Sequence, residues 1–192
     1  MQAHMVKQES TLKLFSGLLL GMTLGFGTIS SAVADPITSE TQAKVEQYKK
    51  KLQEWAADPV LIAAVKEANA KGGAVRGMSN AKWDELASTD PVVKGTQTSA
   101  AGKRVTKLEE STDINKLFVR DARGDLVAGS AKPLLFNNAV RPAFANAITG
   151  KVYSDAEVKT DPTTLKKSVQ VSAPILDGGK PIGVLHTAVT AN

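Results

Sequence analysis

The 192-residue sequence contains no cysteine and only two histidines. The absence of cysteine excludes disulfides, thiolate metal sites, covalent haem attachment through cysteine and a cysteine nucleophile. One of the two histidines lies in an N-terminal segment that we expect to be removed. A site built from two or more histidines is therefore excluded as well, and we expect neither a metal ion nor a cofactor.

Clustered charge is also scarce. The net charge is +5, and it falls to +4 without residues 1–34, which carry Lys7, Lys13 and Glu9. The basic residues are spread along the chain, and the single basic run, residues 49–51, is interpreted as a solvated helix face. Nothing in this pattern indicates a nucleic-acid partner.

Residues 1–34 have the composition of a secretion signal. An uncharged, apolar stretch ends in Ala32-Val33-Ala34, the small-x-small pattern that signal peptidase reads. Cleavage there leaves residues 35–192, and a secreted chain without disulfides fits the bacterial periplasm. The alternative is an uncleaved anchor in the inner membrane, because the stretch from Leu14 to Ala34 has the roughly 20 residues that suffice to span a bilayer.

The order of the hydrophobic patterns predicts helices first and strands afterwards. Residues 35–111 carry apolar side chains at steps of three and four, as at Val45 and Tyr48, which is typical of amphipathic helices. Residues 112–192 carry five short stretches of strand character, with a long insertion between the second and the third, and the third comprises residues 151–159. We therefore predict one α+β domain, residues 35–192, in which N-terminal amphipathic helices pack on a five-stranded antiparallel sheet.

The last two predicted strands, Val169–Leu176 and Pro181–Val189, form a hairpin around Gly178-Gly179. A two-residue turn at this position pairs Val171 with His186, and side-chain alternation then defines two faces. The face predicted to pack on the helices comprises Val169, Val171, Ala173, Ile175, Ile182, Val184, His186 and Ala188. The opposite, mixed face comprises Ser168, Gln170, Ser172, Pro174, Gly183, Leu185, Thr187 and Val189. A mixed face of this kind is either solvated or the floor of a small-molecule pocket, over which residues 132–150 could lie as a lid.

Two motifs in the strand region give the chain a family resemblance. The first, D-x-x-G-x-x-V-A, consists of Asp121, Gly124, Val127 and Ala128. The second, S-x-P-I-x-x-x-G-x-x-I-G-V, consists of Ser172, Pro174, Ile175, Gly179, Ile182, Gly183 and Val184. Together with the leading amphipathic helix, they make residues 42–189 resemble a single Cache domain, the PAS-like extracytoplasmic sensor domain of bacterial receptors.

The resemblance implies a fold and a function. The fold is a five-stranded antiparallel PAS-like sheet, and we expect the final strand to be central in it. The function is that of a sensor rather than an enzyme: a small ligand, often a carboxylate or an amino acid, binds beneath the segment between strands two and three. The Tyr/Arg/Trp/Tyr/Asp set of the amino-acid-binding members cannot be traced here. Since the sequence stops at Asn192, we expect the ligand state to pass to a separate partner, such as a membrane receptor or a kinase.

Several polar residues are candidates for contacting such a ligand. Arg141 is the first, because a guanidinium can hold a carboxylate by two parallel hydrogen bonds; the alternative is an exposed arginine without a role. The remaining candidates offer amides, a phenol, a carboxylate or hydroxyls, or else simply pair with their neighbours. They are Asn137, Asn138, Tyr153, Asp155, Gln170, Ser172 and Thr187.

Two other functions compete with the sensor hypothesis. The first is a ligand-free interaction or structural module, which a side-chain-filled sheet face would favour. The second is a secreted hydrolase using Ser172, His186 and an aspartate. The predicted register opposes the hydrolase because it places Ser172 and His186 on opposite faces, and the sequence has no G-x-S-x-G nucleophile elbow. A buried, hydrogen-bonded histidine in the core is the preferred interpretation of His186. The sequence does not specify the oligomeric state.

Overall fold

The computed structural model describes residues 36–110 and 113–191. The predicted secretion signal, its cleavage site after Ala34 and the alternative membrane anchor lie outside the described residues. No helix within these two ranges combines the length and the apolar character that spanning a bilayer requires.

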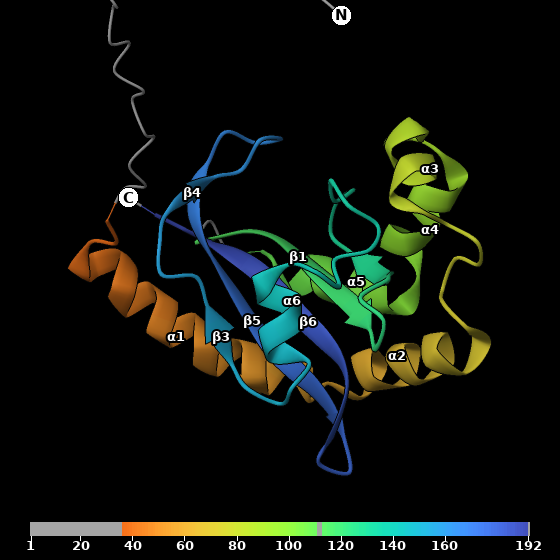
Figure 1. The fold of residues 1–192 in the computed structure, drawn as a ribbon, viewed down its shortest axis with the longest axis horizontal. Helices are drawn as coiled ribbons and strands as arrows, with labels where there is room; N and C mark the ends of the chain where they lie inside the picture. The colour runs from red at the N-terminus through yellow and green to blue at the C-terminus, as the bar shows by residue number, and fades with distance from the viewer. Residues whose placement is uncertain (1–35, 111–112, 192) are drawn as a thin grey trace, which may run out of the picture. The chain divides into compact units, whose positions relative to one another are not determined.

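An antiparallel sheet forms the centre of the described fold, with the strands in the order β2-β1-β6-β5-β3 and β4 paired to β5 (Figure 1). The strands are β1 (Ile114–Asp121), β2 (Leu126–Gly129), β3 (Tyr153–Ser154), β4 (Lys159–Thr160), β5 (Lys167–Asp177) and β6 (Lys180–Thr190). The last strand, β6, is central, between β1 and β5, as predicted. The α+β class is confirmed.

The predicted number of strands is corrected from five to six. Residues 151–159 were expected to form one strand, but they form β3 and the start of β4, separated by a bend. The Asp155 side chain holds this bend, because it accepts hydrogen bonds from the Tyr153 hydroxyl at 3.0 Å and from the Lys159 ammonium at 2.8 Å. Val158, on the far side of the bend, is buried.

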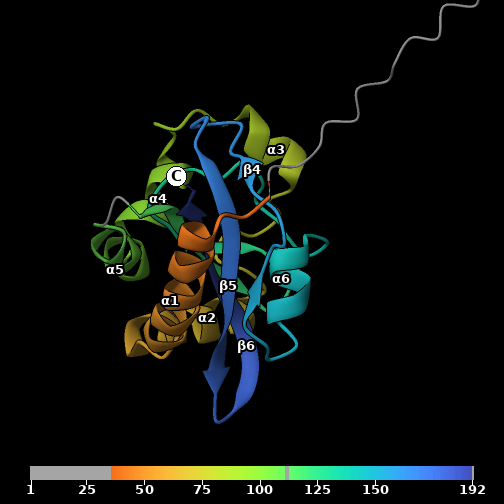
Figure 2. The ribbon, with the colours of Figure 1, turned by 90° about the vertical axis from the view of Figure 1, so that its left-hand side faces the viewer.

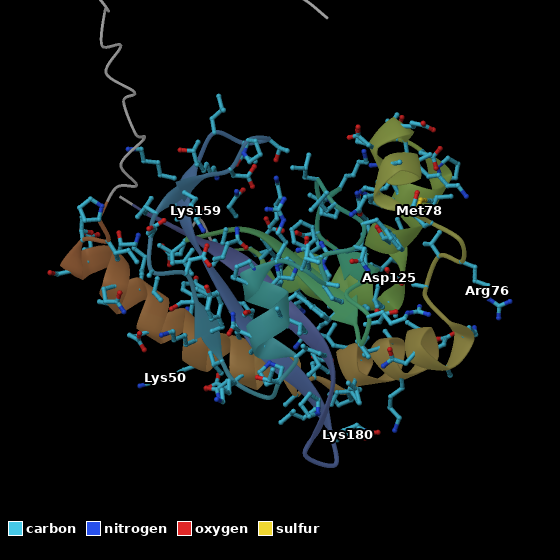
Figure 3. The ribbon with its side chains drawn as sticks, in the orientation of Figure 1. Lys50, Arg76, Met78, Asp125, Lys159 and Lys180 are labelled. Carbon is cyan, nitrogen blue, oxygen red and sulfur yellow. The ribbon has the colours of Figure 1, made fainter. Side chains whose placement is uncertain are left out.

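Helices cover both faces of the sheet. The helices are α1 (Ser39–Ala56), α2 (Pro59–Lys71), α3 (Asn80–Glu85), α4 (Pro91–Thr98), α5 (Ala100–Leu108) and α6 (Pro142–Ala147). α1 packs along β5, while α2 and α5 pack on β1. Figure 2 shows α1 and α6 on opposite sides of β5 and β6. The outward face of α1 is exposed at Lys50 (Figure 3), whereas Lys49 and Lys51 are half-buried, so the basic run is only partly solvated.

The main core lies between α1, α2, α5 and the sheet. Tyr48 and Leu52 of α1 are fully buried against the apolar side chains of β5. Those β5 side chains are Val169, Val171, Ala173 and Ile175, the same four that alternation predicted for the helix-facing side. The prediction for β5 is therefore confirmed.

The prediction for β6 is wrong because the hairpin contains a β-bulge. Asp177 pairs with Lys180 as expected, but the register shifts between Ile175 and Leu176, so that Ile175 pairs with Gly183. Ile182 is the extra residue, and its carbonyl accepts a hydrogen bond from the Asn69 side chain of α2 at 2.8 Å. Since one extra residue exchanges the faces of a strand, everything beyond the bulge on β6 is reversed relative to our prediction.

Candidate functional site

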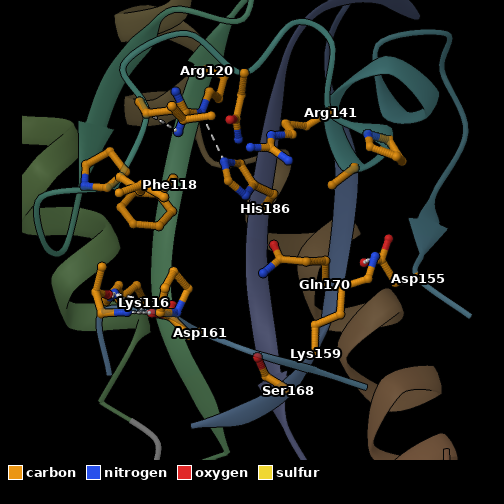
Figure 4. A pocket seen from close by; sticks show the side chains of 18 of the residues that line it. Lys116, Phe118, Arg120, Arg141, Asp155, Lys159, Asp161, Ser168, Gln170 and His186 are labelled. Carbon is orange, nitrogen blue, oxygen red and sulfur yellow. Dashed lines mark hydrogen bonds and ion pairs between the residues drawn. The ribbon is translucent and has the colours of Figure 1, made fainter. Parts of the chain in front are cut away.

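A pocket of about 350 Å³ lies on the face of the sheet opposite α1, between β1, β6, β5 and the loops before α6 and after β4 (Figure 4). The predicted lid supplies part of its wall through residues 133–135, Asn138 and residues 141–143. The pocket is lined by Lys116, Phe118, Arg120, Pro133, Leu134, Leu135, Asn138, Arg141, Pro142, Ala143, Asp155, Lys159, Thr160, Asp161, Pro162, Thr163, Ser168, Gln170 and His186.

Arg120 of β1 is almost completely buried in the wall of this pocket. Its Nη1 donates to the backbone carbonyls of Phe136 and of Gly124, and its Nη2 donates to that of Leu135 at 3.2 Å. Burial lowers the pKa of Arg120 to about 9, while the charges of Asp125 and Asp121 act in the opposite direction. The guanidinium thus remains a cation at neutral pH and holds the loop before α6 against the sheet.

His186 of β6 lies beside this guanidinium. Its Nε2 accepts a hydrogen bond from Arg120 Nε at 3.0 Å, and its ring packs on Phe118 with 5.3 Å between ring centroids. Burial and the neighbouring charge of Arg120 hold the pKa of His186 well below 6.5, so the ring is neutral at pH 7. Its Nδ1 is buried and has no hydrogen-bond partner among the described residues.

Arg141 occupies the N-cap position of α6 and makes no side-chain cap. The residue is exposed, and no ion pair or hydrogen bond involves its guanidinium within residues 36–110 and 113–191. Figure 4 shows its side chain extending into the pocket at the same end as Arg120 and His186. Arg120, Arg141 and His186 thus lie together at one end of the pocket.

The two pocket carboxylates are both paired with lysines. Asp161 lies 3.3 Å from Lys116 Nζ, and Asp155 lies 2.8 Å from Lys159 Nζ. Burial acts to raise the pKa of Asp161, but hydrogen bonds from Thr163 and the charge of Lys116 outweigh it and lower the pKa to about 2. With four cationic side chains against two carboxylates, the pocket walls carry a surplus of positive charge. The arrangement suits an anion.

Half of the predicted site residues line the pocket. Those that do are Arg141, Asn138, Asp155 and Gln170. Those that do not are Asn137, Tyr153, Ser172 and Thr187.

The predicted residues outside the pocket make contacts within the fold. The Asn137 amide donates to Asp125 at 2.7 Å and to the Arg123 carbonyl at 2.9 Å, which fixes the turn of the β1–β2 hairpin. Thr187 is buried on the helix side of β6 because of the bulge, and its hydroxyl donates to the Lys116 carbonyl. The Tyr153 hydroxyl donates to Asp155.

The predicted separation of Ser172 and His186 is also wrong. The two residues are paired directly across β5 and β6 and therefore share a face. They nevertheless make no nucleophile–base contact, since the Ser172 hydroxyl donates to the Ala143 carbonyl at 2.6 Å and His186 Nε2 is occupied by Arg120. The hydrolase hypothesis thus gains no support from this arrangement.

Several pocket residues were not predicted from the sequence, and the fold explains why each of them escaped prediction. Lys116, Phe118 and Arg120 alternate along β1 and so share the pocket face, but β1 is buried on both sides, which hides the period-two signal. His186 was assigned to the core because the bulge was not foreseen. Lys159 and Asp161 flank a bend and a turn whose conformation the sequence pattern does not specify.

No family model matches the chain, and no curated protein matches it. Solved structures with a similar fold include the V. cholerae histidine kinase DctB sensor domain, at 15% identity and a TM-score of 0.41. The match covers 79% of this chain and 57% of the DctB chain. They also include the C. jejuni chemoreceptor Tlp3 ligand-binding domain with L-norvaline, at 13% identity and a TM-score of 0.41, where the match covers 80% of this chain and 63% of the Tlp3 chain. The E. coli DcuS sensor domain has 15% identity and a TM-score of 0.38, and the match covers 69% of this chain and 92% of the DcuS chain. This chain thus spans less than two thirds of the DctB and Tlp3 chains. These matches are sensor or ligand-binding domains, and likeness at this level carries no argument about the function or the ligand of this chain.

Proposed function

We propose that this protein is a periplasmic sensor domain that binds a small organic carboxylate in the pocket and passes its bound state to a partner, such as a membrane receptor or a kinase. The observation that carries the proposal is the Arg141 guanidinium, which extends into the pocket without a partner among the described residues. An unpaired arginine fork is the group best suited to hold a carboxylate by two parallel hydrogen bonds.

The paired state of the pocket carboxylates favours a carboxylate without an amino group over an amino acid. An ammonium group needs a free acceptor, but Asp155 and Asp161 are already bound by Lys159 and Lys116. The acceptors left for an ammonium group are neutral ones, such as the amide oxygens of Asn138 and Gln170. An anion without a cationic group needs no such acceptor.

The cavity itself argues against the ligand-free interaction module. On that alternative the sheet face would be filled by side chains, whereas here about 350 Å³ remains open among converging polar groups. Secretion into the periplasm is part of the proposal and rests on the pattern of residues 1–34. N-terminal sequencing of the secreted protein should begin at Asp35, and a full-length, membrane-bound product would contradict cleavage.

A thermal-shift comparison of propanoate and L-alanine tests the pocket, since the two differ by the ammonium group. Propanoate at a hundred times its dissociation constant should stabilise the fold by about 2.7 kcal/mol, and L-alanine should bind more weakly. Arg141→Ala should weaken propanoate binding about 10- to 100-fold, because a hydrogen bond to a charged group contributes roughly 1.5–3 kcal/mol.

The matched control is Arg76→Ala. Arg76 is an exposed arginine outside the pocket whose Nε donates to the Lys71 carbonyl (Figure 3), so its loss should leave propanoate affinity unchanged. Equal affinity in Arg141→Ala and Arg76→Ala would remove Arg141 from the site. If no carboxylate of a wider panel shifts the melting temperature, the interaction-module alternative becomes the better description.

A further inference from the structure

The contact between Arg120 and His186 fixes the position of the imidazole proton. A guanidinium carries five N–H donors and no acceptor. Because Arg120 Nε lies 3.0 Å from His186 Nε2, that nitrogen has to be the unprotonated acceptor of the ring. The proton of the neutral imidazole is therefore on Nδ1.

This Nδ1–H group is a buried donor that nothing in the described chain accepts. His186 is only 5% exposed, yet it lines the pocket. A buried donor without an acceptor costs a fold about 1–3 kcal/mol, so such groups are rare unless a ligand or water completes them. The low pKa of His186 supports the same assignment, since burial and the adjacent cation disfavour a second proton on the ring.

Arg120 itself is committed to other partners. Its Nε is bound to His186, and its two terminal nitrogens donate to backbone carbonyls of the loop before α6 and of the β1–β2 turn. These contacts occupy four of its five N–H groups, so that the main role of Arg120 is to orient its neighbours. Arg141, by contrast, has no partner among the described residues and extends into the same end of the pocket (Figure 4).

We propose that Arg120 is a positioning residue that locks His186 in the Nδ1–H tautomer, and that this N–H donates a hydrogen bond to the anion that Arg141 binds. The inference rests on the proposed function of the pocket and adds a second, neutral recognition point to it. The site then selects anions that place an acceptor oxygen against His186, either the second carboxylate oxygen or an adjacent hydroxyl or carbonyl group.

The tautomer can be tested on the ligand-free protein by long-range ¹H–¹⁵N NMR of the imidazole rings. The chain has one other histidine, His4, so a His186→Gln variant assigns the signals. We expect His186 Nδ1 to resonate as a protonated nitrogen and Nε2 as an unprotonated acceptor at pH 7. Protonation of Nε2, or of both nitrogens, would overturn the role given to Arg120. In Arg120→Lys, which keeps the charge but loses the planar fork, the signal should shift toward a mixture of tautomers.

The donor role is tested by two substitutions that separate the ring nitrogens. The amide nitrogen of an asparagine lies three bonds from Cα, as Nδ1 of a histidine does. The amide group of a glutamine ends four bonds from Cα, as Nε2 does. His186→Gln can still accept from Arg120 through its amide oxygen but places no donor at the position of Nδ1, so it should fold normally and bind propanoate about 10- to 100-fold more weakly. His186→Asn should melt at a lower temperature yet bind propanoate with an affinity closer to that of the wild type.

Each outcome decides one claim. Equal propanoate affinity in the wild type and in His186→Gln would make His186 purely structural. If the wild type binds no carboxylate, the proposed function and the donor role both fail, while the NMR spectrum still decides independently whether Arg120 fixes the tautomer.

Discussion

Acidification from pH 7 to pH 5 should destabilise the fold through His186. The ring is neutral in the folded state because burial and the charge of Arg120 hold its pKa well below 6.5. In the unfolded chain the same histidine titrates near 6.5. Below that pH the unfolded state therefore binds one proton more than the folded state, and stability must fall as the pH falls.

The magnitude follows from this linkage. Each pH unit below 6.5 over which the folded ring stays neutral removes about 1.4 kcal/mol, so the loss between pH 7 and pH 5 is at most about 2 kcal/mol, and stability should reach a plateau above pH 7. Arg120, whose charge faces the ring, has a pKa of about 9 and stays charged throughout this range. Asp161, with a pKa of about 2, stays ionised in the folded state and adds little above pH 5.

Urea denaturation followed by tryptophan fluorescence measures the effect, because Trp83 is fully buried in the fold. The control is His186→Gln, which retains every carboxylate, so that other titrations cancel in the difference. The variant should lose less stability than the wild type between pH 7 and pH 5, by at most about 2 kcal/mol. Equal losses would refute the assignment of a buried neutral imidazole.

Three further substitutions test the packing of the fold. Ile175→Ala should cost about 2–5 kcal/mol in unfolding free energy by urea denaturation, because Ile175 is fully buried under the helices, and a loss below about half a kcal/mol would contradict its place in the core. Gly183→Ala should cost about 1–3 kcal/mol in the same assay, since its Cβ would lie 2.4 Å from the Arg120 carbonyl oxygen; an unchanged midpoint would speak against the close approach of β1 and β6. Asp161→Asn should lose about 1–3 kcal/mol and raise hydrogen exchange in residues 162–165, whereas unchanged exchange would mean that the Lys116–Asp161 contact does not hold that turn.

The features that sequence could predict are those that repeat along the chain. The helix-facing side of β5 follows from strict alternation between Val169 and Ile175, and the place of β6 in the sheet was expected from its apolar character. The bulge at Ile182 was not predicted because alternation assumes an unbroken period of two. Its signals are nevertheless present, since Pro181 removes a ladder donor and Gly183 is a residue that often marks bulges.

The sequence predicted the pocket residues that carry free polar groups in loops or on the pocket face of β5, and missed those of β1 and β6. Arg141 was found because a loop arginine without a core role is a natural anion ligand, and the residue does line the pocket. Arg120 was missed because its partners are backbone carbonyls, which have no residue signature in the sequence. A buried arginine satisfied by main-chain oxygens can be recognised only after the loop conformation is known.

The bulge at Ile182 also has a consequence for how such a pocket can change. It is a single extra residue, yet it decides which alternate side chains of β6 face the pocket and which face the helices. Deleting Ile182 would turn His186 and Val184 toward the helices and bring Leu185 and Thr187 to the pocket, while every remaining side chain stays the same. A change in strand length alone would therefore exchange the side chains that β6 presents to the pocket.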